Sequence, residues 1–275
     1  MFKKINLYIK KFIYFFLRDF LIWKSYKLQA LLGILSGFLG LIQFGLIGKF
    51  ISGGNYFPMI EKYGGDIITY FITGSVFLSF TSLALTSFKN IIRQEQLMGT
   101  IEYLLLSKTS LWEVFMTTLL SRFIFNILNT TLIFLFLIYI FQVKIFINIF
   151  LSFLILSLTM IVLSGIGIMS AGFIMIFKKG DPINWIYSFL AGIFSGIYFP
   201  IEILPNWLQV VSKFLPTTYA MDSLRKSLII NATFEDIKIN VLILIIMSIF
   251  LLPTGIIFFK HAFNKARYEG TLIQY

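Results

Sequence analysis

Six stretches of the sequence are long enough and apolar enough to cross a lipid bilayer as helices. The hydrocarbon core of a bilayer is about 30 Å thick and an α-helix rises about 1.5 Å per residue, so a spanning helix needs about 20 mostly apolar residues. The stretches that meet this requirement are residues 28–47, 67–88, 114–141, 146–177, 183–199 and 240–260. The sequence therefore predicts an all-α integral membrane protein with six transmembrane helices.

The composition agrees with this class and excludes a soluble enzyme. Hydrophobic residues make up 58% of the chain and charged residues 13%, against roughly 45–50% and about 25% in soluble domains. A soluble fold with so few charged residues could not cover its own surface. No repeat or low-complexity linker divides the chain, so we expect one domain over residues 1–275, with the six-span bundle at 28–260 and a tail at 261–275.

Two prolines modify the last two spans. The fifth span is short and ends at Pro200, so it depends on the segment that follows it. Pro253 lies inside the sixth span, where it removes one backbone donor and is expected to kink the helix.

The basic residues fall between the apolar stretches and predict the orientation of the chain. An even number of spans places both termini on one side, which carries 15 Lys and Arg residues against seven on the other side. Since Lys and Arg accumulate on the cytoplasmic side, we expect a multi-pass protein of the cell membrane with both termini in the cytoplasm. The net charge of +11 is explained in this way, without a nucleic-acid partner. Arg122, within the third span, either reaches back to the cytoplasmic surface or takes part in a transport path.

Residues 1–27 precede the bundle, and residues 2–26 have one apolar face at helical spacing. That face consists of Ile5, Ile9, Phe12, Ile13, Phe16, Phe20 and Trp23. The basic residues Lys3, Lys10, Arg18 and Lys24 lie off it, which is typical of an amphipathic helix in the cytoplasmic membrane interface. The alternative, a seventh span, would have to bury four charged residues between Lys10 and Asp19.

The predicted spans lack the groups that most membrane chemistry requires. All twelve acidic residues lie in loops or at span ends, the chain has no Cys, and its single His261 stands at the end of an apolar run. Ion-coupled transporters usually carry a carboxylate or His near the membrane midplane, and an intramembrane enzyme needs reactive side chains there. The sequence therefore predicts no catalytic residue, no metal site and no bound coupling ion.

The chain also lacks a phosphate-binding loop. The nearest match is segment 45–50, which reads Gly-Leu-Ile-Gly-Lys-Phe. A Walker A loop needs glycine at position 43, where Gln43 stands, and Ser or Thr in place of Phe50. We expect no cofactor in this chain, and the energy for uphill transport has to come from another chain.

The cytoplasmic loop between the second and third predicted spans has the residues of a short helix. Gly99 favours the end of one helix, and Thr100 can cap a second helix that carries Tyr103 and Leu104. A compact helix with exposed leucines suits docking into a groove on a soluble partner. The alternative is a tight connector that packs on its own spans.

The segment 200–239 is too polar to span the membrane and too apolar to be a free loop. Pro205 and Pro216 each occupy a position where proline begins a helix, so the sequence predicts helices over 205–214 and 216–230. Two short amphipathic helices after a short span are typical of a re-entrant helical hairpin between spans five and six, with the backbone buried by protein. Within the second helix, the spacing of Asp222, Arg225 and Lys226 predicts pairing at i+3 and i+4.

With these segments in place, the chain resembles the membrane subunits of ABC transporters of the type-2 export family over essentially its full length. The resemblance is carried by residues 99–105, which read Gly-Thr-Ile-Glu-Tyr-Leu-Leu, and by residues 195–205, which read Ser-Gly-Ile-Tyr-Phe-Pro-Ile-Glu-Ile-Leu-Pro. Residues 215–220, Leu-Pro-Thr-Thr-Tyr-Ala, and the pair Leu224-Arg225 continue it. Lys108 departs from the family, which usually has proline after the loop helix.

The resemblance implies a transmembrane permease subunit that works as a dimer with two copies of a separate ATPase subunit, which binds the ATP and Mg²⁺. It implies an ATPase-coupling loop with Gly99, Thr100, Glu102, Tyr103 and Leu104. It also implies an extracellular re-entrant hairpin with Pro200, Glu202, Pro205, Pro216, Tyr219 and Arg225.

The cargo is left open by the residues. Within the family, the run 195–205 is more similar to the branch that exports drugs and small amphiphiles. An exporter of lipid-linked polysaccharide or teichoic acid is the alternative in the same class. A pore or a structural membrane protein without an ATPase is the alternative from another class.

Overall fold

The computed structural model describes residues 2–52, 58–64, 66–97, 99, 111–142, 145–146, 148–178 and 180–270, and every regular element in these ranges is helical. The elements in chain order are α1 (Phe2–Ser25), α2 (Lys27–Ser52), η1 (Pro58–Tyr63), α3 (Ile67–Leu97), α5 (Leu111–Phe141), α6 (Ile149–Phe177), α7 (Pro182–Phe194), η2 (Ile201–Ile203), α8 (Asn206–Lys213), α9 (Pro216–Ile229) and α10 (Phe234–Tyr268). The prediction of an all-α protein is confirmed for these ranges.

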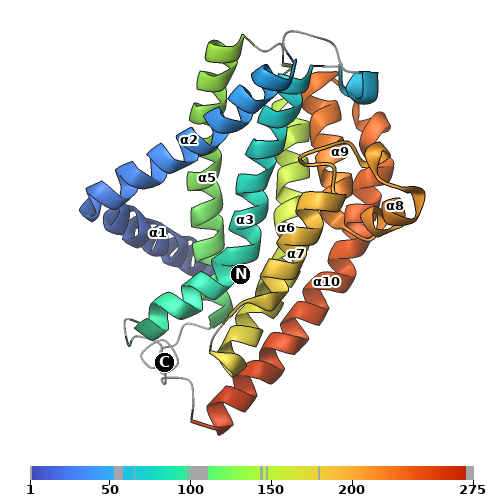
Figure 1. Cartoon of the computed structure of the whole chain (residues 1–275). Helices are drawn as coiled ribbons and strands as arrows, with labels where there is room; N and C mark the ends of the chain where they lie inside the picture. The colour runs from blue at the N-terminus through green and yellow to red at the C-terminus, as the bar shows by residue number, and fades with distance from the viewer. Residues whose placement is uncertain are drawn as a thin grey trace.

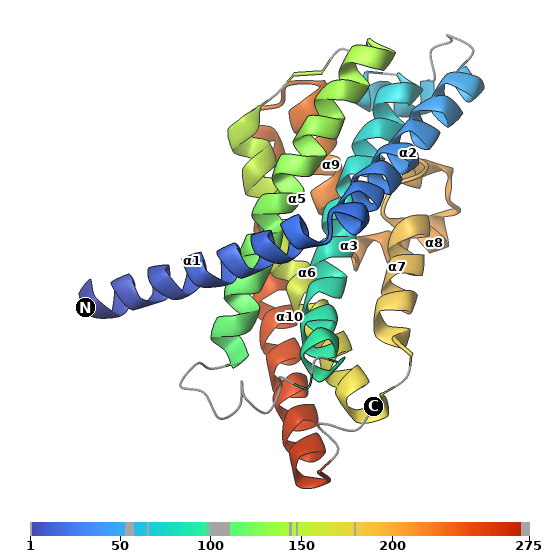
Figure 2. The same cartoon turned by 90° about the vertical axis from the view of Figure 1, so that its left-hand side faces the viewer.

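Four helices are long and apolar enough to cross a membrane: α3, residues 113–141 of α5, α6 and α10. They run side by side in both views (Figures 1 and 2). The ends of α3, α6 and α10 and the start of α5 lie at one end of the bundle, which we call the proximal end (Figure 1). The opposite end, where α3, α6 and α10 begin, is the distal end. Helix α9 packs against α6, α10 and α3 in the distal half of the bundle.

Helix α7 is shorter than the fifth predicted span. Asp181 caps its first turn, Pro182 follows at the first helical position, and the helix ends at Phe194 after 13 residues. At about 1.5 Å per residue this gives a length of about 20 Å, less than the thickness of a bilayer core. Residues 195–199, which the sequence assigned to the span, form a bend instead.

Helix α1 runs crosswise to the long helices instead of alongside them (Figure 2). Two ion pairs attach it to the proximal end: Lys11 Nζ lies 2.5 Å from Glu113 of α5, and Arg18 Nη1 lies 3.3 Å from Glu95 of α3. The ring of Phe16 stacks on Phe125 of α5, with 5.0 Å between ring centroids. The contacts place α1 next to the end of α3 and the first half of α5.

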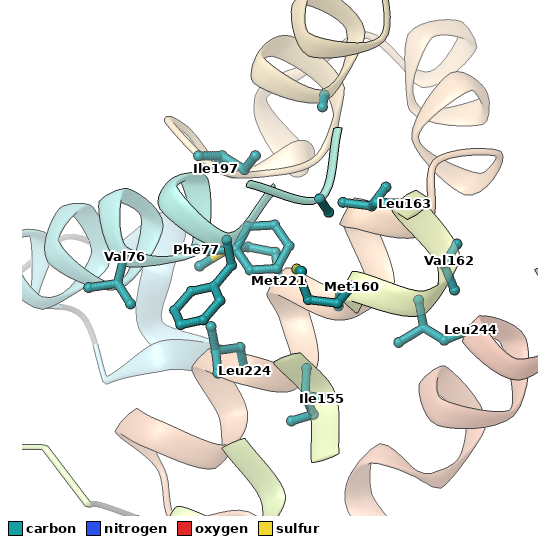
Figure 3. Close-up of a cluster of buried hydrophobic side chains, with 14 of the residues drawn as sticks. Val76, Phe77, Ile155, Met160, Val162, Leu163, Ile197, Met221, Leu224 and Leu244 are labelled. Carbon is teal, nitrogen blue, oxygen red and sulfur yellow. The ribbon is translucent and has the colours of Figure 1, made fainter. Parts of the chain in front are cut away.

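The largest hydrophobic core lies where α3, α6, α9 and α10 meet. Figure 3 shows side chains from these helices and from the bend after α7 converging on one cluster. It includes Val76, Phe77, Ile155, Met160, Leu163, Ile197, Met221, Leu224 and Leu244, all of which are buried. The segment after α7 is thus part of the core, although it is not helical.

Glycines allow α6 to approach its neighbours at backbone distance. A Cβ atom added to Gly165 would lie 2.4 Å from the carbonyl oxygen of Leu251 in α10, and one added to Gly255 would lie 2.3 Å from that of Gly165. On another side of α6, a Cβ atom at Gly167 would lie 2.6 Å from the carbonyl oxygen of Ala84 in α3. Small residues at helix contacts are how membrane helices gain close packing without a hydrophobic driving force between them.

The α6–α10 contact predicts that Gly165→Leu destabilises the protein. The added side chain has to push the two backbones apart, and overpacking of this kind typically costs about 1–3 kcal/mol. Gly40→Ala is the matched control, because a Cβ atom at Gly40 in α2 meets nothing within 4 Å. Thermal unfolding in detergent should show a lower midpoint for Gly165→Leu alone. A midpoint equal to that of the wild type would contradict the close contact.

Candidate functional site

The candidate site lies where α7 ends at Phe194 and the chain continues as a bend. Gly196 has a φ of +73°, a left-handed conformation that favours glycine, and it turns the chain out of the helix. The carbonyl groups of Gly196 and Ile197 follow the end of α7 and have no helical hydrogen bonds of their own. In a buried, water-poor region such groups need other donors.

The donors come from Arg225 of α9, whose side chain is 1% exposed. Its Nη1 donates to the carbonyl oxygen of Gly196 at 2.5 Å, and its Nη2 donates to that of Ile197 at 3.0 Å. Nη2 also donates to the carbonyl oxygen of Tyr70 at 3.1 Å, and Nε donates to Thr73 Oγ1 at 3.4 Å. One guanidinium therefore joins α9, the bend after α7 and the first turns of α3.

Two tyrosine rings stabilise the charge of Arg225. The guanidinium carbon lies 3.3 Å from the ring centroid of Tyr70 and 5.5 Å from that of Tyr63 in η1, within the range of cation–π attraction. The hydroxyl of Tyr70 donates to the carbonyl oxygen of Gly196 at 2.5 Å. Within the described ranges, no carboxylate oxygen lies within ion-pair distance of the guanidinium. Carbonyl dipoles and aromatic faces thus replace a direct counter-ion.

Gly74 gives the Arg225 side chain its space. A Cβ atom at this position would lie 2.6 Å from the carbonyl oxygen of Ile197 and 3.2 Å from Nη2 of Arg225. Glycine is therefore required in α3 for the bend and the guanidinium to approach the helix together.

Asp222 forms a second layer next to Arg225. It accepts hydrogen bonds from the Tyr63 hydroxyl at 2.6 Å and from Asn240 Nδ2 at 2.9 Å, and Lys226 Nζ lies 2.8 Å away. Burial favours the neutral acid, but these hydrogen bonds and the Lys226 charge outweigh it and hold the pKa of Asp222 below its usual range. Burial, and then the neighbouring Asp222, raises the pKa of the Tyr63 phenol. Asp222 is therefore ionised and Tyr63 neutral at physiological pH.

The structure corrects one predicted pairing in this helix. Asp222 pairs with Lys226 at i+4 as expected, but Arg225 turns away from Asp222 and serves the backbone carbonyls. The sequence contained no signal for this, because the acceptors are main-chain atoms.

The other predicted hairpin residues lie at the distal end together with Arg225. Pro205 precedes the first residue of α8, and Pro216 begins α9. Tyr219 joins the two helices, since its hydroxyl donates to the carbonyl oxygen of Lys213 at 2.9 Å. Glu202 follows Pro200 and pairs with Lys62 of η1 at 2.6 Å.

The predicted ATPase-coupling loop lies mostly outside the described residues. This applies to Thr100, Glu102, Tyr103 and Leu104. Gly99 is described: it has a φ of +67° and follows the end of α3 at Leu97, as expected of a residue that ends a helix.

A second polar cluster at the proximal end escaped the sequence analysis. Asp181 caps α7, accepts from Ser170 Oγ of α6 at 2.6 Å and pairs with Lys89 of α3 at 2.6 Å. Burial opposes its ionisation, but the hydrogen bonds from Lys89, Ser170 and the Asn184 amide outweigh burial and lower the pKa of Asp181. Helix α3 is therefore attached to the start of α7 by Lys89 and Asp181, and to the bend after α7 through Arg225. The Asp181-Pro182 pair was a readable signal for a helix start, but Lys89 lies too far along the sequence to be assigned as its partner.

The sequence profile of the family described as ABC-2 type transporter matches residues 9–229. The chain belongs to the ABC-2 type transporter family. It is therefore a transmembrane component of an ABC transporter, in a membrane and with an ABC ATPase as its partner. The ABC-2 match ends at the last residue of α9. It therefore contains Arg225, the backbone carbonyls that Arg225 binds and both ends of α7. No curated protein matches the chain.

The geometry predicts that Arg225→Lys and Arg225→Met both lower the unfolding temperature. A lysine ammonium cannot reach acceptors arranged for the planar fork of a guanidinium. Each buried acceptor left without a donor costs about 1–3 kcal/mol. Lys213→Met in α8 is the control, because that residue is exposed. Scanning fluorimetry should show a clear loss for both Arg225 variants, and an Arg225→Lys midpoint no lower than the control would contradict this role.

Proposed function

We propose that the chain is the permease subunit of an ATP-driven exporter that moves a small amphiphilic or drug-like molecule, or a lipid, outward. Two such subunits, identical or different, pair with two copies of the ATPase. The single observation that carries the proposal is the ABC-2 family match over residues 9–229. The absence of a Walker A loop from the sequence supports the division of labour, since ATP hydrolysis then belongs to the partner.

We further propose six membrane crossings, formed by α2, α3, α5, α6 and α10 and by α7 together with the bend at residues 195–199 that follows it. The proximal end faces the cytoplasm, because it carries Lys89, Lys178, Lys265 and most of the other basic residues. Helices α8 and α9 then form the re-entrant hairpin on the outer side. The burial of Met221, Leu224 and Leu228 in α9 supports this assignment, since a non-spanning segment is tolerated at membrane depth only where protein surrounds it.

Helix α1 is proposed to lie in the cytoplasmic interface. It runs across the bundle and leaves Ile13, Leu17 and Leu21 exposed, as a surface anchored in lipid headgroups would be. Its pairs with Glu95 and Glu113 hold it against α3 and α5, the two helices that the coupling loop joins in the sequence. A force applied to that loop by the ATPase then acts on α1, α3 and α5 together.

The coupling route proposed here runs along α3 and α7. The coupling loop follows α3 directly, and α3 is attached to the start of α7 by Lys89–Asp181 and to its end by Arg225. A displacement of the proximal end of α3 would then reach the distal hairpin through these polar contacts, without repacking of the hydrophobic core. In this proposal α3 and α7 move together as one rigid pair.

The function is tested by co-purification. The tagged chain, extracted from its native membrane, should carry an ABC ATPase identified by mass spectrometry, and the complex should hydrolyse ATP. The chain alone, verified as a single subunit, should show no turnover. ATP hydrolysis by that preparation would refute the division into permease and ATPase.

The proposed coupling role of Glu102 is tested in the same complex. A hydrogen bond to a charged group contributes about 1.5–3 kcal/mol, so Glu102→Ala should lower transport by roughly one to two decades. Membrane expression of Glu102→Ala should equal that of the wild type. The control is Glu235→Ala, which removes an exposed carboxylate in the first turn of α10 and should leave transport unchanged. Transport at the wild-type rate would remove Glu102 from the mechanism. Loss of expression would assign it to the shape of its own loop.

A further inference from the structure

A cavity of about 200 Å³ opens beside Arg225 at the distal end of the bundle. Side chains from η1, α3, η2, α9 and α10 contribute to its wall. The polar and charged residues of the wall include Lys62, Tyr63, Glu202, Thr218, Asp222, Arg225 and Asn240. Carboxylates and a tyrosine face share this small space, which is the combination of groups that binds organic ammonium ions.

The cavity already holds one ammonium group, that of Lys62. Its Nζ lies 2.6 Å from Glu202 Oε1 and 4.0 Å from Asp222 Oδ1. It also lies 4.8 Å from the ring centroid of Tyr63, within cation–π range. The chain has thus placed a tethered cation where two carboxylates and an aromatic face converge.

Lys62 is poorly fixed in this position compared with the other cations nearby. Its side chain is 42% exposed and that of Glu202 is 53% exposed, and exposed pairs of this kind contribute little to stability. Arg225 is fully buried, and Lys226 binds the other oxygen of Asp222. Lys62 can therefore leave while the rest of the cluster stays in place.

One polar atom in the wall has no partner in the described part of the structure. Thr218 Oγ1 is buried, makes no hydrogen bond there, and belongs to a residue that lines the cavity. A buried hydroxyl without a partner is costly, and Thr218 adds such an unsatisfied group beside the cavity.

We propose that this cavity binds a small organic ammonium group, free or as the headgroup of a lipid or amphiphile, and that the ligand displaces Lys62. Its volume equals that of roughly six or seven waters at about 30 Å³ each, which suits a group of the size of choline. Glu202, Asp222 and the Tyr63 ring surround the cation. The ligand bridges η1, η2 and α9, so its binding bears directly on the distal hairpin. This site goes beyond the proposed transport function, which does not require it.

The test is binding of radiolabelled choline to the purified full-length chain in phosphatidylglycerol nanodiscs, measured by scintillation proximity. Lys62→Ala removes the resident cation and should tighten binding by about tenfold, because Glu202 loses its Lys62 partner and Asp222 and the Tyr63 ring each lose one neighbouring cation. Lys238→Ala is the matched control, since it removes an exposed lysine, paired with Glu235, outside the cavity wall. Adding Glu202→Gln to Lys62→Ala should abolish the gain.

The neutral isostere 3,3-dimethylbutan-1-ol separates charge from shape and should not compete with choline. In phosphatidylcholine nanodiscs, reduced binding of soluble choline would identify the lipid headgroup as the source, and unchanged binding would identify a free cation; both uphold the site. Equal affinity in the wild type, Lys62→Ala and Lys238→Ala would overturn the proposal. So would competition by the isostere, or absence of choline binding in every variant that elutes as folded protein. No ATPase or transport is measured, so failure here is distinct from failure of the proposed function.

Discussion

A chain that bends inside a protein core must find donors for the carbonyl groups that its helix no longer bonds, because little water is available to replace them. At the end of α7 the donors come from a single side chain, Arg225. Arginine suits the task because its planar guanidinium presents five N–H donors in fixed directions and stacks on aromatic rings. The distal end of the molecule is organised around this one group.

The neighbouring structure follows from that interaction. Gly74 leaves room in α3 for the bend and the guanidinium, and Tyr70 supplies both a ring face and a hydroxyl. Asp222 places a negative charge close by without contacting the guanidinium, and is itself held by Tyr63 and Asn240. At the other end of α7, the Lys89–Asp181 pair completes the attachment to α3. Helix α7 is thus held at its two ends, while the glycine contacts of α6 hold the long helices together.

The sequence predicted those parts of the fold that depend on local pattern. The positions of the four long apolar helices α3, α5, α6 and α10 follow from the lengths of apolar runs, and the starts of α8 and α9 follow from Pro205 and Pro216. The family resemblance followed from short motifs, and the family match agrees with it. Each of these signals lies within a few consecutive residues, so no knowledge of distant contacts was needed.

The remaining features depend on partners that are distant in sequence or carry no side-chain signature. Arg225 binds backbone carbonyls, which every residue has, so its spacing from Asp222 suggested the wrong partner. Lys89 and Asp181 are 92 positions apart in the sequence. Gly165 and Gly255, which meet at the α6–α10 contact, are separated by a similar length of chain. Helix α7 ends early, at Phe194, because Gly196 adopts a left-handed conformation and Arg225 donates hydrogen bonds to the carbonyl groups that leave the helix. Only the tertiary structure brings these groups together.

The central claim is that Arg225 fastens the distal segments to α3, and hydrogen–deuterium exchange of Arg225→Met against the wild type tests it most directly. The account predicts faster exchange confined to residues 66–76, 195–204 and 216–229, the three segments that the guanidinium joins. Exchange around the glycine contacts of α6 and α10 should not change, because those contacts do not involve Arg225. Unchanged exchange at residues 195–204, or a uniform increase along the whole chain, would contradict the account.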